Sequence, residues 1–274
     1  GDASRVIMDR AVPFIRSAAR ARKPFFAVIW FHAPHEPVRA GARYREMYAG
    51  FSEAEQHYYG CITALDEQMG RLRQELRGLG VAGNTMLWYA SDNGPEGRHP
   101  RQGRTRGSAG GLRGRKRSLF EGGIRVPGLL EWPDRIRSPR VTRVPCSTSD
   151  YLPTVLDILA FRSPAQPEPL DGIPLGALLD GKMAERPRPI AFQTTDSGAA
   201  EAEGRLGSPP LALIGNRYKF LSYLDEDRAA EDLLFDIAID PGERFNIVQE
   251  LPQLAREMKT QLREFRESCR RSEA

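Results

Sequence analysis

The sequence lacks the features typical of disulfide-rich, zinc-binding and membrane-spanning proteins. Its three cysteines, Cys61, Cys146 and Cys269, are odd in number and widely spaced, which fits neither a disulfide framework nor a zinc site. No apolar run is long enough to span a bilayer, and the first residues lack the basic, apolar and small-residue order of a signal peptide. Because the chain begins inside a predicted helix, we expect a longer protein whose targeting segment lies upstream.

Nucleotide and nucleic-acid binding also find little support. The glycines between residues 110 and 114 lack the spacing of a phosphate-binding fingerprint. The neighbouring basic residues have no aromatic residues between them, which argues against a nucleic-acid partner. Their local excess of charge favours either an anionic ligand or a solvated loop, and they are Arg98, Arg101, Arg104, Arg106, Arg113, Arg115, Lys116 and Arg117.

Helical and strand-like patterns alternate through the first two thirds of the chain. Apolar residues recur at helical spacing over residues 6–18 and again over residues 52–79, where Ser52 and Glu55 predict a capping box. Continuous apolar runs at residues 25–31 and 86–88 predict strands that are covered on both faces. This order predicts an α/β fold, with a mostly parallel sheet flanked by helices, over residues 1–185.

The pattern changes after Arg186. Four short apolar segments, at residues 190–194, 211–215, 218–224 and 232–236, follow one another closely and predict an antiparallel meander. An apolar stripe over residues 252–268 predicts a final helix. We therefore expect residues 186–274 to form a small C-terminal subdomain with an antiparallel sheet and a terminal helix.

Both predicted central strands end in polar residues. Residues 86–88 lead into Ser91-Asp92-Asn93-Gly94, and residues 25–31 lead into His35 between two prolines. Ligands bind at the carboxyl ends of the strands in open α/β sheets, and the oxygens of Asp92 and Asn93 suit Ca²⁺ or Mg²⁺. Asp-Asn-Gly is equally an ordinary turn sequence, and His35 equally an exposed loop residue, so the residues alone leave both interpretations open.

Two other charged residues have structural interpretations. Asp150 precedes an apolar stripe over residues 152–159 and predicts a helix cap. Glu121 lies four residues before Arg125, and the two side chains are expected to pair and fix their loop.

Taken in order, several motifs make the chain resemble the type I sulfatases, which belong to the alkaline-phosphatase-like superfamily. Each motif is weak alone, but together they cover nearly the whole chain at the family's spacing. They are Ala33-Pro34-His35-Glu36-Pro37, Ser91-Asp92-Asn93-Gly94, Gly110-Gly111-Leu112-Arg113-Gly114-Arg115-Lys116, Phe120-Glu121-Gly122-Gly123-Ile124-Arg125-Val126-Pro127, Tyr151-Leu152-Pro153-Thr154-Val155-Leu156-Asp157 and Leu234-Phe235-Asp236, followed by Asp240-Pro241-Gly242-Glu243 and Asn246.

This resemblance implies a role for four residues. Asp92 and Asn93 would be ligands of a divalent cation, usually Ca²⁺ in this family, with Mg²⁺ as the alternative. Lys116 would bind a sulfate oxygen, and His35 would lie beside the sulfate and the ester oxygen of the leaving alcohol, so both would be catalytic and substrate-binding residues. The implied substrate is a sulfate ester, either a small molecule or a sulfated glycan. The implied location is extracytoplasmic: periplasmic, secreted or lysosomal.

The chain departs from the family at its nucleophile. These sulfatases use a formylglycine made from Cys or Ser in a Cys/Ser-x-Pro-x-Arg signature, and none occurs in the 274 residues. The family's early pair of metal-binding aspartates is absent as well. The chain therefore resembles the C-terminal portion of a sulfatase, with the formylglycine expected upstream. As an isolated chain it should be inactive and bind Ca²⁺ poorly, because this ion takes about six to eight oxygen ligands.

Two other functions remain open at this stage. A phosphatase or phosphonate hydrolase of the same superfamily would also use a metal, a lysine and a histidine. A noncatalytic module that binds sulfated glycans would keep the basic site without turnover, and its binding would depend strongly on salt. The residue at the nucleophile position separates the two hydrolases.

Overall fold

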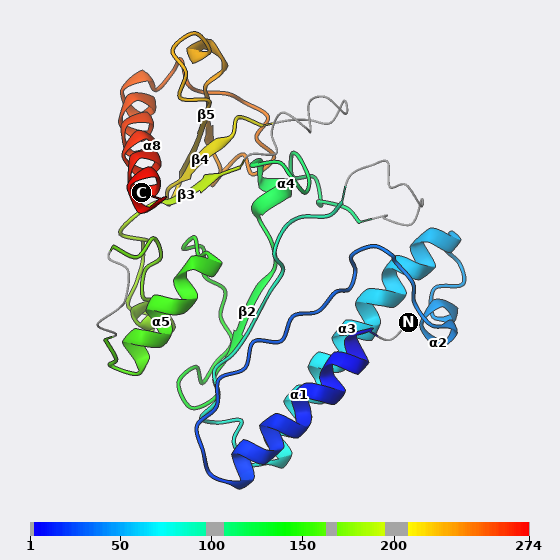
Figure 1. The fold of residues 1–274 in the computed structure, drawn as a ribbon. Coiled ribbons are helices and arrows are strands. Elements are labelled where there is room, and N and C mark those ends of the chain that lie inside the picture. Colours follow the sequence, from blue (N-terminus) through cyan, green and yellow to red (C-terminus); the bar gives the residue numbers. More distant parts are fainter. Residues whose placement is uncertain (1–2, 97–106, 163–168, 195–207, 274) are drawn as a thin grey trace. The chain divides into compact units, whose positions relative to one another are not determined.

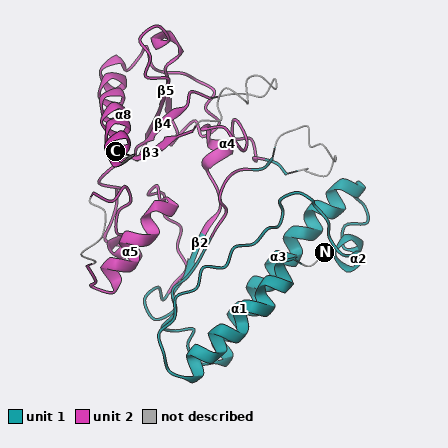
Figure 2. Ribbon diagram, viewed as in Figure 1, with its two compact units in different colours: residues 1–89, 95–108, 129–137 teal, residues 90–94, 109–128, 138–274 magenta. Residues whose placement is uncertain are grey.

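The computed structural model describes residues 3–96, 107–162, 169–194 and 208–273, in two compact units (Figures 1 and 2). Unit 1 comprises residues 1–89, 95–108 and 129–137, and unit 2 comprises residues 90–94, 109–128 and 138–274. None of the described helices is long and apolar enough to cross a membrane. Four arginines of the basic segment lie outside the described residues: Arg98, Arg101, Arg104 and Arg106.

Unit 1 is built on two long helices, α1 (Ala3–Arg20) and α3 (Glu53–Gly78), which pack along each other (Figure 1). Their shared core consists of Met8, Val12, Ile15, Leu72 and Leu76. The short helix α2 (Ala42–Glu46) packs on α3 as well. The predicted capping box is confirmed, since Ser52 N donates to Glu55 Oε2 at 3.1 Å and Glu55 N donates to Ser52 Oγ at 3.4 Å.

The prediction of a buried strand at residues 25–31 is wrong. This segment has no strand pairing among the described residues, and its side chains are half-buried or exposed. Phe25, Ile29 and Phe31 pack against the core of α1 and α3. The side chains between them face solvent, with exposed fractions of 72% for Phe26, 60% for Val28 and 84% for Trp30. A continuous apolar run thus gives a segment that is covered on one side only.

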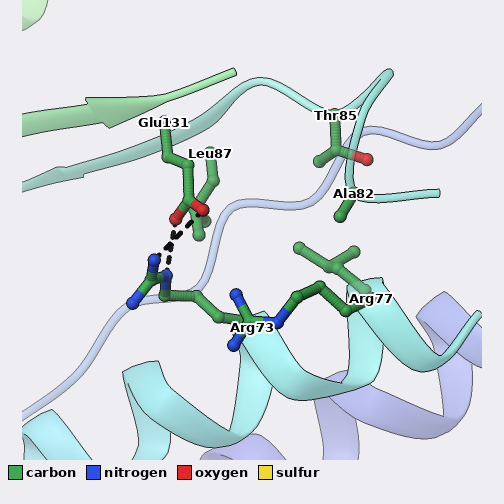
Figure 3. Close-up of a pocket in the computed structure, with 7 residues that line it drawn as sticks. Arg73, Arg77, Ala82, Thr85, Leu87 and Glu131 are labelled. Atoms are coloured by element: carbon green, nitrogen blue, oxygen red, sulfur yellow. Dashed lines mark hydrogen bonds and ion pairs between the residues drawn. The ribbon is translucent and has the colours of Figure 1, made fainter. Parts of the chain in front are cut away.

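A two-stranded sheet pairs β1 (Leu87–Ala90), close to the strand predicted at residues 86–88, with β2 (Gly128–Glu131). Figure 3 shows how β2 is tied to α3. Arg73 Nε lies 2.5 Å from Glu131 Oε2, and Arg73 Nη2 lies 3.1 Å from Glu131 Oε1. The cavity beside this ion pair measures about 10 Å³, so it is a packing gap and has no room for a substrate.

Unit 2 contains the predicted antiparallel meander. Its strands are β3 (Ile190–Gln193), β4 (Leu211–Ile214), β5 (Tyr218–Ser222) and β6 (Leu233–Asp236), paired in that order. The final helix α8 (Pro252–Glu273) covers one face through a core that includes Leu213, Phe220, Leu234 and Leu262 (Figure 1). On the opposite face, Leu119 and Phe120 pack against Ala212, Leu221 and Phe235. The segment before helix α4 (Glu121–Ile124) is therefore part of the core of the C-terminal sheet.

Asp150 does not cap helix α5 (Tyr151–Ile158) as was expected, although its side chain belongs to the capping box of the preceding short helix η1 (Thr148–Asp150). Helix α5 has no side-chain cap bond at its start. The fully buried Asp150 carboxylate instead pairs with Arg186, with both N···O distances at 2.8 Å. It also accepts backbone N–H groups from Ser147 and Ile173, both at 2.8 Å. Asp150 thus joins η1 to the residues before α6 (Gly176–Leu179).

The capping box yields a stability prediction. Substituting Ser52→Ala removes the acceptor for Glu55 N, so we expect the free energy of unfolding to fall by about 1 kcal/mol. Chemical denaturation followed by circular dichroism measures this change. Ser17→Ala, an exposed change inside α1, is the matched control and should have an effect below about 0.5 kcal/mol. Equal effects of the two substitutions would contradict the capping role.

Candidate active site

The segment after β1 forms a tight polar turn. Asn93 N donates to Asp92 Oδ1 at 2.9 Å, and Ser91 Oγ donates to Asn93 O at 3.1 Å. Asn93 Nδ2 donates to Gly94 O at 2.8 Å. The turn interpretation of Asp-Asn-Gly is therefore confirmed. It is compatible with a ligand role, because Asp92 is exposed and the Asn93 amide oxygen is the end not turned to its own backbone.

Lys116 lies in a second turn, over residues 113–118. Ser118 N donates to Arg115 O at 3.0 Å. Gly114 and Arg117 on either side adopt positive φ values of 75° and 74°, a backbone conformation that glycine adopts readily and other residues rarely do. The Lys116 side chain is half-buried. This turn presents one lysine from a backbone of unusual and well-defined shape.

Helix α4 holds both turns through close backbone contacts. Gly94 N donates to Gly123 O at 2.8 Å, and Gly122 N donates to Arg113 O at 2.6 Å. A Cβ atom at Gly94 would lie 1.9 Å from Gly122 O, and one at Gly123 would lie 2.0 Å from Ser118 O. Only glycine permits this approach. Asp92, Asn93 and Lys116 are thus carried by two turns that share one support.

A buried ionic network fixes that support to the C-terminal sheet. Lys219 of β5 is fully buried, and its Nζ lies 2.9 Å from Glu121 Oε1 and 2.9 Å from Glu243 Oε1. Glu121 N donates to Glu243 Oε2 at 2.7 Å. Burial raises the pKa of Glu243, and the adjacent Lys219 ammonium opposes that rise.

Only one contact of this network was predicted from the sequence. The expected pairing of Glu121 with Arg125 is confirmed, with Arg125 Nη1 3.3 Å from Glu121 Oε2. Lys219 and Glu243 were missed as its buried partners. The available signal was a lone lysine among the apolar residues of a predicted strand, in Tyr218-Lys219-Phe220-Leu221.

Arg113 belongs to the scaffold of the second turn. Its guanidinium lies 3.8 Å from the centre of the Phe120 ring, and Arg113 Nη1 donates to Glu243 O at 3.2 Å. Burial lowers the pKa of Arg113, although the nearby Glu243 opposes that shift. Arg113 therefore stacks on Phe120 and helps to position the backbone of the Lys116 turn.

His35 lies in unit 1, whereas Asp92, Asn93 and Lys116 lie in unit 2. Its side chain is exposed, and His35 Nδ1 lies 3.0 Å from Glu36 O. The His32 ring stands 5.1 Å away, and His32 Nε2 lies 2.9 Å from the same carbonyl oxygen. The structure thus brings three of the four predicted site residues onto one support and orders the fourth within its own proline-flanked turn.

Comparison with known proteins identifies the chain. The Sulfatase family model matches residues 1–160, and the model of the N-sulphoglucosamine sulphohydrolase C-terminal region matches residues 114–268. The chain belongs to the sulfatase family. The predicted resemblance to sulfatases is therefore confirmed, over both halves of the chain.

Individual relatives are distant but extensive matches of this sulfatase chain. N-acetylgalactosamine-6-sulfatase of Sus scrofa is 28% identical over 259 residues, covering 88% of this chain and 48% of that protein. Arylsulfatase A of Bos taurus is 30% identical over 270 residues, covering 90% and 50%. The crystal structure of Ps i-CgsB in complex with k-i-k-neocarrahexaose has a TM-score of 0.78 at 24% identity, covering 96% and 54%. The chain thus spans about half the length of the relatives it matches.

The oxygen donors of this sulfatase chain suit a hard cation in type but fall short in number. Asp92 and Asn93 supply a carboxylate and an amide oxygen, which are typical ligands of Ca²⁺ and Mg²⁺. The described residues contain no cluster of three or more His, Cys, Asp or Glu side chains that could hold a metal. Further ligands are needed to reach the coordination number of either ion.

The glycine contacts predict strong intolerance of substitution. Gly123→Ala places a methyl group against Ser118 O, so we expect it to lower the free energy of unfolding of unit 2 by about 2–4 kcal/mol. Gly70→Ala is the control: it lies within α3 with open space around it, and it should stabilise by about 0.5–1 kcal/mol. Thermal unfolding of both variants tests the difference, and a stable Gly123→Ala variant would exclude the close contact.

The raised pKa of Glu243 predicts a dependence of stability on pH. Folding favours the protonated form, so this contribution is fully present below the ordinary value of 4.5 and is lost as the pH rises through the raised value. Because glutamine does not ionise, the stability of the Glu243→Gln variant relative to the natural protein should increase across that window. Denaturant midpoints measured at several pH values above and below 4.5 test this, and a constant difference would contradict it.

Proposed function

We propose that the protein containing this chain hydrolyses sulfate monoesters, and that this chain supplies part of its metal and sulfate site. The observation that carries the proposal is the support common to both turns: in a member of the sulfatase family, Asp92-Asn93 and Lys116 are held by one short helix, α4. A cation and an ammonium group on one support suit the negatively charged oxygens of a sulfate ester.

Each residue has a role in this proposal. Asp92 and Asn93 would hold a Ca²⁺ ion, or Mg²⁺ as the alternative, which when bound neutralises charge on the sulfate. Lys116 would bind a sulfate oxygen and stabilise the charge that develops during ester cleavage. His35 would assist protonation of the departing alcohol oxygen. The formylglycine nucleophile would come from a part of the protein outside residues 1–274.

The proposed substrate is a sulfated glycan or a smaller sulfate ester. A sulfatase-fold neighbour has been solved in complex with k-i-k-neocarrahexaose, which favours the glycan. An extracytoplasmic location is proposed from the family resemblance alone.

The fold of the natural protein is proposed on the same basis. The presence of both helices and sheets gives the α/β class. The mostly parallel sheet is expected only in the natural protein, if residues 25–31 pair there with another strand. The division into a catalytic portion, residues 1–185, and a C-terminal subdomain, residues 186–274, stays a prediction.

Mass spectrometry of peptides from the natural full-length protein tests the chemistry directly. An aldehyde in a Cys/Ser-x-Pro-x-Arg peptide would establish the formylglycine route. A serine or threonine nucleophile without that signature would favour the phosphatase or phosphonate hydrolase. Binding of sulfated glycans without turnover, with strong salt dependence, would favour the noncatalytic module.

Substituting Lys116→Ala in the full-length enzyme tests the sulfate site. We expect kcat/KM for a sulfate ester to fall by about 10²-fold or more, because the charge that offsets the sulfate is lost. Lys182→Ala, at an exposed lysine just after α6, is the control and should leave kcat/KM unchanged. A change below about twofold for Lys116→Ala would remove this residue from the mechanism.

A further inference from the structure

The ionic network around Lys219 places a charged side chain in the core of the C-terminal sheet, which costs free energy. Burying an ammonium group carries a desolvation penalty that its ion pairs offset only when the geometry is good, and well-packed apolar side chains often give equal or greater stability. Lys219 nevertheless lies within β5, next to its first residue, opposite Phe235 of β6 and Ile214 of β4. Apolar residues at all three positions would complete that face of the sheet.

The groups that face Lys219 come from separate parts of unit 2. Glu121 is the first residue of α4, and Glu243 follows β6, so the carboxylates reach the ammonium from 98 residues before it and from 24 residues after it in the sequence. Glu243 also receives the Glu121 N–H, and its carbonyl oxygen accepts from Arg113. The network thus fixes the first turn of α4 and the start of the Lys116 turn at once.

The fixed helix end is the part that carries the two turns. Gly122 and Gly123 directly follow Glu121, and their backbone bonds to Arg113 and Gly94 hold the turns of Lys116 and of Asp92-Asn93. A small rotation of α4 would therefore move both turns, because the close contacts at the glycines leave no free space between α4 and the turns.

We propose that Lys219, with Glu121 and Glu243, is a positioning residue that sets Lys116 and the Asp92-Asn93 pair in register for one ligand. This role rests on the proposed function and explains why charged residues occupy a site that apolar residues could fill. The C-terminal sheet then serves as the rigid base of the active site.

Lys219→Met in the natural full-length protein tests the role. Amide hydrogen exchange of peptides covering residues 90–94 and 113–124 should become about tenfold faster or more, because the end of α4 loses its anchor. The kcat for a sulfate ester should fall by about tenfold or more while KM changes less, since binding groups remain but their geometry loosens.

The matched control is Lys259→Met in the same subdomain. Lys259 is also largely buried and pairs with a carboxylate, with Lys259 Nζ 3.0 Å from Asp232 Oδ2, but this pair joins α8 to the start of β6. It should lower thermal stability without changing exchange at residues 113–124 or kcat. Equal exchange and equal kcat for the two variants would overturn the proposal.

A double variant covers the case in which Lys219→Met fails to fold. Lys219→Met combined with Glu121→Gln removes one charge of each sign and leaves Glu243 able to become neutral by taking up a proton. It should recover folding and still show fast exchange at both turns. Natural exchange rates and kcat in the double variant would overturn the proposal. If the unmodified protein cleaves no sulfate ester, the proposed function fails, and the exchange data alone still decide the positioning role.

Discussion

Close backbone contact at three glycines is the constraint on which the candidate site depends. Gly94, Gly122 and Gly123 let carbonyl oxygens lie where any side chain would stand, and hydrogen bonds then lock the adjoining turns to α4. Two polar motifs, about two dozen residues apart in the sequence, become neighbours on one support as a result. The chemistry of Asp92, Asn93 and Lys116 is carried by side chains, but their placement is a property of the backbone.

The C-terminal sheet extends this constraint to a larger part of unit 2. One of its faces packs on α8, and the other accepts Leu119 and Phe120 beside the buried lysine. Arg113 stacks over Phe120 and so ties the Lys116 turn to the same core. The C-terminal sheet is therefore part of the framework of the proposed sulfate site.

Local signals in the sequence were sufficient where local physics decides the structure. The capping box at Ser52 and the four strands of the meander follow from residues close in the chain, and both are confirmed. The interpretation failed at residues 25–31, because burial of a strand depends on partners that an apolar run does not specify, and Phe26, Val28 and Trp30 are exposed. The prediction that Asp150 caps a helix failed for a related reason, because its partner Arg186 lies 36 residues away in the sequence. Lys219 and Glu243 were not predicted as partners of Glu121 for the same reason, since both are distant from it in the sequence. Asp92, Asn93 and Lys116 were predicted, because each lies in a local motif.

The long reach of the Lys219 network also bears on the order of folding. Glu121 pairs with Lys219, which lies 98 residues further along the chain, and with Glu243, which lies 122 residues further along. Contacts between residues so far apart form slowly, because closing the intervening chain costs conformational entropy before the contact contributes any stabilisation. During synthesis the turns proposed for the cation and the sulfate are made first, yet their framework is complete only when the chain has passed Glu243. The framework of the candidate site therefore depends on residues that are made well after the two turns themselves.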